Sequence, residues 1–97
     1  MSDEQLKRCL QSIGMACFVK YFYKFRDPSR SSADLVELLM KEKCYEESGA
    51  RVRVSQARKI ISHKREVDAI RNVAAAKRVP SAVADEAKSI LIKFLSP

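Results

Sequence analysis

Two apolar stripes follow one another in the first 26 residues, and they point in different directions. Both recur at helical spacing, the first at positions 6, 9, 10 and 13 and the second at positions 15, 18, 21, 22 and 25. At 100° per residue their mean directions differ by roughly 120°. One straight helix cannot bury both stripes on one side, so we expect a break at residues 12–14, with Gly14 as the C-terminal cap. A continuous helix covered on both sides is the alternative.

Hydroxyl side chains mark where the first long helices should begin. Ser2 with Gln5, and Ser31 with Asp34, have the three-residue spacing of a capping box, in which each side chain satisfies the other residue's backbone N–H. The second box predicts a helix over residues 33–43. The unit before it should end ahead of Pro28, because a residue that precedes proline avoids the helical conformation.

The second half of the chain also divides into separate helical stretches. Apolar positions 54, 57, 60 and 61 point roughly 140° away from positions 67, 70, 73 and 74, which predicts a break near residues 62–65. Ser48 is expected to cap a helix that begins at Gly49 or Ala50, with Ser55 as a later alternative. The alternation over residues 51–54 resembles a strand, but four residues without a partner strand carry little weight. Ser81 is expected to cap a last helix over residues 81–95.

These patterns predict an all-α fold: one compact domain over residues 1–97, built as a bundle of five or six short helices. A chain of 97 residues is long enough for one hydrophobic core, and 46% hydrophobic residues exclude wholesale disorder. Five of the seven aromatic residues lie at positions 18, 21, 22, 23 and 25. They could stack on nucleic-acid bases, but their helical spacing favours the core.

The three cysteines indicate a reducing environment. Their number is odd and they show no C-x-x-C spacing. Cys9 and Cys17 fall on the apolar side of the helical pattern, which favours buried, inert thiols over a redox or metal-binding role. The chain also shows neither a secretory signal nor an apolar run of membrane-spanning length. We therefore expect a cytoplasmic protein.

All of the net charge lies in residues 51–78. This segment holds nine basic and two acidic residues, which equals the formal charge of +7 of the whole chain; the remainder has ten of each. The alternative is a basic surface that is only solvated and binds no partner. The concentration of charge favours a polyanionic partner instead.

Within this segment, residues 50–62 would place their cations on one helical face. Arg51 and Arg58 are seven positions apart and nearly in line, opposite an apolar face. Guanidinium groups and hydroxyls hold phosphate oxygens, and arginine also reads guanine edges. The segment lacks aromatic residues, which favours duplex DNA over single strands. The predicted contact residues are Arg51, Arg53, Ser55, Gln56, Arg58, Lys59 and Arg65.

Two partial resemblances accompany this interpretation. A helix over 33–43, a short turn and a helix that carries Arg51, Ser55 and Arg58 resemble a helix-turn-helix in outline, which would imply a transcriptional regulator or a phage or mobile-element accessory protein. The run at residues 10–14 (LQSIG), followed by Phe18 and Phe22, is similar to a segment of the SAM domain, a small five-helix interaction domain. That similarity extends to these residues alone.

Enzymatic chemistry finds little support in the sequence. His63, the single histidine, lies between Ser62 and Lys64, and the pattern offers neither an orienting carboxylate nor a nucleophile for it. Metal-ligand spacings and glycine-rich phosphate loops are absent. We expect no enzymatic activity, no cofactor, no metal and no small-molecule substrate.

The rival hypothesis is a protein-interaction module. In that case the helix over residues 81–95 would form a homodimer or dock on a partner, and the basic face would meet an acidic protein. The two hypotheses are compatible, since regulators commonly bind as symmetric dimers. A membrane partner is not expected, because the apolar face of residues 50–62 lacks leucine and aromatic residues and is assigned to the core.

Overall fold

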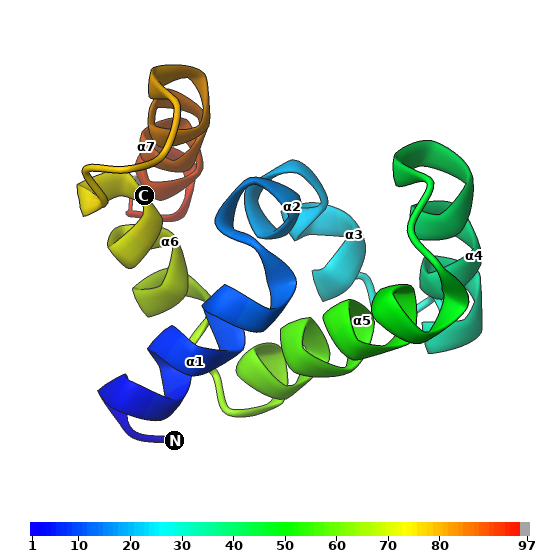
Figure 1. The fold of residues 1–97 in the computed structure, drawn as a ribbon. Helices are drawn as coiled ribbons and strands as arrows, with labels where there is room; N and C mark the ends of the chain where they lie inside the picture. Colours follow the sequence, from blue (N-terminus) through cyan, green and yellow to red (C-terminus); the bar gives the residue numbers. More distant parts are fainter. Residues whose placement is uncertain (96–97) are drawn as a thin grey trace.

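The computed structural model describes residues 1–95, and this range contains seven helices (Figure 1). They are α1 (Asp3–Ile13), α2 (Met15–Lys20), α3 (Phe22–Arg26), α4 (Ser32–Lys43), α5 (Glu47–Ser62), α6 (Glu66–Ala75) and α7 (Ser81–Leu95). No strand occurs in residues 1–95. The predicted all-α bundle is confirmed: five helices have ten or more residues, and α2 and α3 are two shorter ones.

Helix α5 lies at the centre of the packing. It contacts α1, α3, α4 and α6, whereas α7 packs on α6 and α2. Figure 1 shows α4 and α7 at opposite ends of the molecule, with α1, α2 and α3 between them. Helix α4 packs mainly against α5, with which it forms a hairpin, so α4 is joined to the rest of the bundle chiefly through α5.

The predicted break between the first two apolar stripes is confirmed at Gly14. Its φ of +88° lies in a region that side chains with a Cβ rarely adopt, and its N–H donates to the Leu10 carbonyl at 2.8 Å, which ends α1. A second break, which the pattern did not predict, falls at Tyr21, where φ is −106° and α2 gives way to α3. The N-terminal 26 residues therefore form three helices and not two.

Replacing Gly14 with alanine is expected to lower the free energy of unfolding by about 1–3 kcal/mol, because the positive φ is strained for any L-residue. Space is not the cause, since a Cβ there would meet only ordinary contact with the Cys17 Cβ at 3.9 Å. Chemical denaturation measures the change. D-alanine, introduced by chemical ligation, is the matched control, because it adds the same methyl group and favours positive φ. Equal losses for L- and D-alanine would contradict the conformational explanation.

The aromatic run forms much of the core, as predicted, with one exception. Phe18, Phe22 and Phe25 are buried, and the Phe18 ring lies 5.7 Å from Phe22 edge-on and 6.2 Å from Phe25 in a stack. Tyr21 is buried beside them. Tyr23 instead has 49% of its surface exposed and stacks on the Phe94 ring at 6.3 Å.

The cysteines also lie where the apolar pattern placed them. Cys9 and Cys17 are buried, and Cys44 is exposed. Burial raises the pKa of the Cys17 thiol even though the positive charge of Arg53 acts in the opposite direction. Cys17 is therefore held as the neutral thiol, which suits its place in an apolar core.

The helix starts are only partly as predicted. The capping box of Ser2 and Gln5 is present, and the Ser31 hydroxyl accepts from the Asp34 N–H at 3.1 Å. The prediction for Ser48 is wrong, because α5 begins at Glu47 and continues as helix through residues 51–54. Cys44 takes the left-handed conformation with φ of 56°, which ends α4 abruptly and lets α5 begin after a three-residue turn. Ser81 is the first residue of α7 rather than its cap.

The predicted break at residues 62–65 is confirmed. Helix α5 ends at Ser62, Lys64 has φ of 58°, and α6 begins at Glu66. The basic segment is thereby divided between two helices that point in different directions (Figure 1).

Candidate nucleic-acid interface

Helix α5 carries six of the seven predicted contact residues, but it does not present them on one surface. Arg51, Ser55 and Lys59 are exposed, whereas the other three are half-buried: Arg53, Gln56 and Arg58. Arg65 lies beyond the helix, in the turn before α6. The residues thus separate into an exposed group and a group with internal partners.

The exposed side of α5 is basic and polar over four turns. No acidic residue occurs between Glu47 and Glu66. Ser48, Ser55 and Ser62 are spaced by seven residues, so they lie almost in line along the helix. The exposed residues on this side, which we call the α5 face, are Ser48, Arg51, Val52, Ser55, Lys59 and Ser62. Among residues 1–95, Arg51 is the one cation of the face with an ion-pair partner, Glu47 at 2.5 Å, and both side chains remain exposed.

Arg58 makes its hydrogen bonds within the fold. Its Nη2 donates to the Arg30 carbonyl at 2.6 Å and to the Asp27 carbonyl at 3.3 Å. Both carbonyls belong to the loop between α3 and α4, so the guanidinium fastens that loop to α5. The sequence could not show this contact, because Arg58 is 28 residues from Arg30.

An Arg58→Ala variant is expected to lose about 2 kcal/mol of stability, since two carbonyls lose a charged donor. Arg58→Lys is the matched control: it keeps the charge but loses the planar guanidinium whose Nη2 reaches both carbonyls. If Arg58 acts through the fold, both variants lower the urea midpoint, and Arg58→Lys binds duplex DNA with wild-type affinity under conditions in which it is folded. A stable Arg58→Lys protein with weakened DNA binding would reverse this assignment.

Arg53 supports the turn between α4 and α5. Its guanidinium lies 3.9 Å from the centre of the Tyr45 ring, and Nη1 donates to the Gly49 carbonyl at 3.1 Å. A cation over an aromatic face is attractive, and here it holds the turn against the start of α5. Arg53 is therefore directed away from the α5 face.

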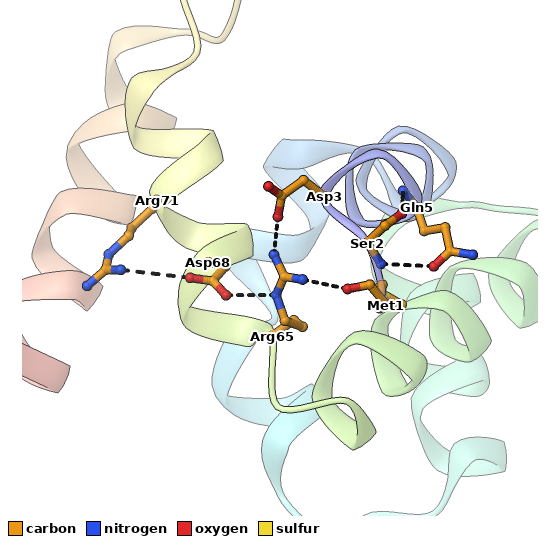
Figure 2. Close-up of polar contacts among 7 residues, drawn as sticks. All are labelled: Met1, Ser2, Asp3, Gln5, Arg65, Asp68 and Arg71. Carbon is orange, nitrogen blue, oxygen red and sulfur yellow. Dashed lines mark hydrogen bonds and ion pairs between the residues drawn. The ribbon is translucent and has the colours of Figure 1, made fainter.

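Arg65 joins the N-terminus of the chain to the first turn of α6 (Figure 2). Its Nη2 donates to Asp3 at 2.5 Å, Nε to Asp68 at 2.7 Å and Nη1 to the Met1 carbonyl at 2.6 Å. The two carboxylates raise the pKa of the Arg65 guanidinium, so it stays charged. Asp68 also lies 3.8 Å from Arg71. Each of the three nitrogens of Arg65 thus has a partner within the chain, which assigns this side chain to the fold.

A groove of about 710 Å³ lies between α4 and α5, and no pattern in the sequence indicates it. Arg51, Ser55 and Arg58 line one side. The remaining lining residues are Ser32, Ala33, Val36, Glu37, Met40, Glu47 and Val54. A groove depends on the angle between two helices, which periodicity within each helix does not determine. Its size is within the range of ligand and peptide sites.

Metal sites and membrane-spanning helices were sought among the residues that the structure describes. Within residues 1–95, no three or more His, Cys, Asp or Glu side chains are placed to hold a metal ion. No helix in that range has both the length and the apolar character needed to cross a membrane. Comparison of the chain with protein-family models, with curated proteins and with solved structures gives no match. Function must therefore be inferred from the surfaces themselves.

Proposed function

We propose that this chain is a nucleic-acid-binding protein that contacts a duplex, DNA in preference to RNA, through the α5 face. The observation that carries the proposal is the stretch between Glu47 and Glu66, which is free of acidic residues and exposes cations beside a row of serines. Phosphate oxygens accept hydrogen bonds from guanidinium, ammonium and hydroxyl groups, so this surface matches a phosphate backbone.

The contact set is smaller than the one inferred from sequence. Arg53, Arg58 and Arg65 have internal partners and are assigned to the fold. The cations of that set that remain for phosphate contact are Arg51 and Lys59 on the α5 face. To them we add Lys64, which was not in the set but is exposed in the turn that follows. Ser55 and Ser62 lie between them and would supply hydroxyl donors.

The hairpin of α4 and α5 resembles a helix-turn-helix in its three-residue turn, but its charges argue for a different approach to the duplex. A recognition helix contacts base edges with its N-terminal residues. Here Glu46 and Glu47 occupy that position and would repel phosphates. We therefore assign contact to the middle and C-terminal half of α5. A role as a regulator or as an accessory protein of a mobile element is part of this proposal.

A salt titration of binding tests the proposal. With three phosphate contacts, log affinity for duplex DNA falls against log salt with a slope near −2.7, from about −0.9 per contact. All five basic residues of the sequence-based set would give a slope near −4.5 on the same basis. Fluorescence anisotropy with duplex DNA, duplex RNA and single-stranded probes measures the affinity at each salt concentration. Absence of binding at low salt would remove the proposal, and tighter binding to single strands would remove its duplex part.

A further inference from the structure

Tyr23 of α3 and Phe94 of α7 form an aromatic pair at the surface. Their rings are stacked, with centroids 6.3 Å apart and an angle of 18° between the ring planes. Phe22, which is fully buried, contacts both rings edge-on, at 5.4 Å and 5.5 Å. The pair is thereby anchored in the core, yet 49% of the Tyr23 surface is exposed. A planar side chain held in this way can stack on a ligand with little further loss of side-chain entropy.

Two cations lie against this aromatic pair. The Arg26 guanidinium is 4.4 Å from the centroid of the Phe94 ring, and the Lys93 ammonium is 5.9 Å from that of Tyr23. Both cations are exposed, and within residues 1–95 neither forms an ion pair. In this they differ from the arginines of α5 that hydrogen-bond within the fold. We call Tyr23, Arg26, Lys93 and Phe94 the α3–α7 cluster.

Positive charge predominates in the segments that form the α3–α7 cluster. Residues 15–26 hold three cations and no acidic residue, and residues 87–95 hold two cations and no acidic residue. Helix α6 packs on α7, and with the turn before it α6 holds two residues of each sign: Arg65, Glu66, Asp68 and Arg71. The balance of charge therefore favours an anionic partner at the cluster.

The remaining acidic residues of these segments do not cancel the two cations of the cluster. Asp85 and Glu86 precede Lys93 by at least seven positions, or roughly 10 Å along α7. Asp27 follows Arg26 directly, but its carboxylate lies 3.7 Å from Arg30 in the loop after α3. Arg26 and Lys93 are thus available to an anion that lies beside the Tyr23 ring.

We propose that the α3–α7 cluster binds an unpaired nucleotide of a single-stranded segment, with its base stacked on Tyr23 and its flanking phosphates held by Arg26 and Lys93. Stacking requires a base whose face is free, and neighbouring base pairs cover both faces within a duplex. An acidic protein segment would use the cations but not the aromatic face. The cluster is therefore a second nucleic-acid contact, and it does not depend on duplex binding by the α5 face.

Two single-stranded probes test this proposal by fluorescence anisotropy at low salt. One is a short oligothymidylate, and the other is an abasic oligonucleotide of the same length and charge. The wild type binds the oligothymidylate about tenfold more tightly, which is within the range for one stacked base. Equal affinity for the two probes, or no binding to either, would overturn the proposal, because phosphate contact alone does not need a base.

Two substitutions at Tyr23 separate stacking from a structural role. Tyr23→Phe keeps the ring and should keep the tenfold preference, whereas Tyr23→Leu keeps an apolar side chain without a ring and should bind both probes equally. Circular dichroism and urea denaturation establish that both variants are folded. Equal loss of the preference in the two variants would contradict stacking. Binding to phosphatidylserine vesicles that Tyr23→Leu abolishes, without any preference for bases, would assign the cluster to a membrane surface instead.

The α5 face provides the control that keeps this proposal separate from the proposed function. Arg51→Ala/Lys59→Ala should keep the preference for oligothymidylate over the abasic probe, although its duplex affinity falls. Tyr23→Leu should keep the duplex affinity and its salt slope. Loss of duplex binding in Tyr23→Leu, with the protein folded, would contradict two independent contacts.

Discussion

Replacing Phe18 with alanine is expected to lower the free energy of unfolding by about 3–5 kcal/mol, the range for a buried phenylalanine. Phe18 is fully buried, and its ring packs against both Phe22 and Phe25, so its removal leaves a cavity among side chains from two helices. Domains of this size have total stabilities of about 5–15 kcal/mol. Urea denaturation, followed by circular dichroism, measures the loss.

Tyr23→Ala is the matched control for the Phe18 variant. Tyr23 belongs to the same aromatic run, but about half of its surface is exposed, and its ring lies 5.4 Å from that of Phe22 and 6.3 Å from that of Phe94. We expect it to cost about 1 kcal/mol, in the range of an aromatic pair. If both variants lost the same stability, the aromatic residues would contribute through local helix propensity and not through burial in a shared core.

Removing the two exposed cations of the α5 face is expected to have the largest effect on binding. At about 50 mM salt, each phosphate contact that is lost lowers affinity roughly tenfold, so Arg51→Ala/Lys59→Ala should weaken duplex binding about 100-fold. The salt slope should become less negative by about 1.8, from about 0.9 per contact. Both side chains are exposed, so stability should change little. Anisotropy titrations at several salt concentrations measure both quantities.

A charge-matched variant tests whether DNA affinity depends on where the removed positive charges lie. Lys7→Ala/Lys41→Ala also removes two exposed positive charges, one from α1 and one from α4, and neither lies on the α5 face. We expect its affinity to fall by much less than that of the Arg51→Ala/Lys59→Ala variant. If the two double variants were equally weakened, binding would follow net charge, and the α5 face would lose its assignment.

The periodicity of apolar residues was sufficient to predict the helices wherever a helix has one buried side. The change of direction between two apolar stripes located the breaks at Gly14 and at residues 62–65, because each stripe must face the core. The periodicity did not predict helix boundaries that are set by the backbone conformation of a single residue. The left-handed Cys44 moved the start of α5 ahead of Ser48, and cysteine at that position carries no turn signal. The break at Tyr21 was likewise invisible, because the aromatic stripe remains continuous across it.

The candidate site was harder to predict than the fold, because an arginine can bind a partner or its own chain. Arg58 and Arg65 occupy positions in the basic segment that look equivalent to Arg51. Their partners are a loop carbonyl 28 residues away and a carboxylate 62 residues away, and such contacts appear only when the helices are packed. What could be predicted was the stretch without acidic residues, since that depends on composition alone.

The separation of α4 from the rest of the bundle has a consequence for how the groove behaves. Because α4 packs mainly on α5, we expect it to detach at a free energy below that of global unfolding, although its detachment would expose the buried Leu35 and Leu39. The Arg58 contact with the Arg30 carbonyl opposes this local opening at one end of α4, and the Arg53–Tyr45 stack opposes it at the other. A ligand bound in the groove would thus be thermodynamically linked to the closed hairpin, and its affinity would include the free energy needed to keep α4 in place.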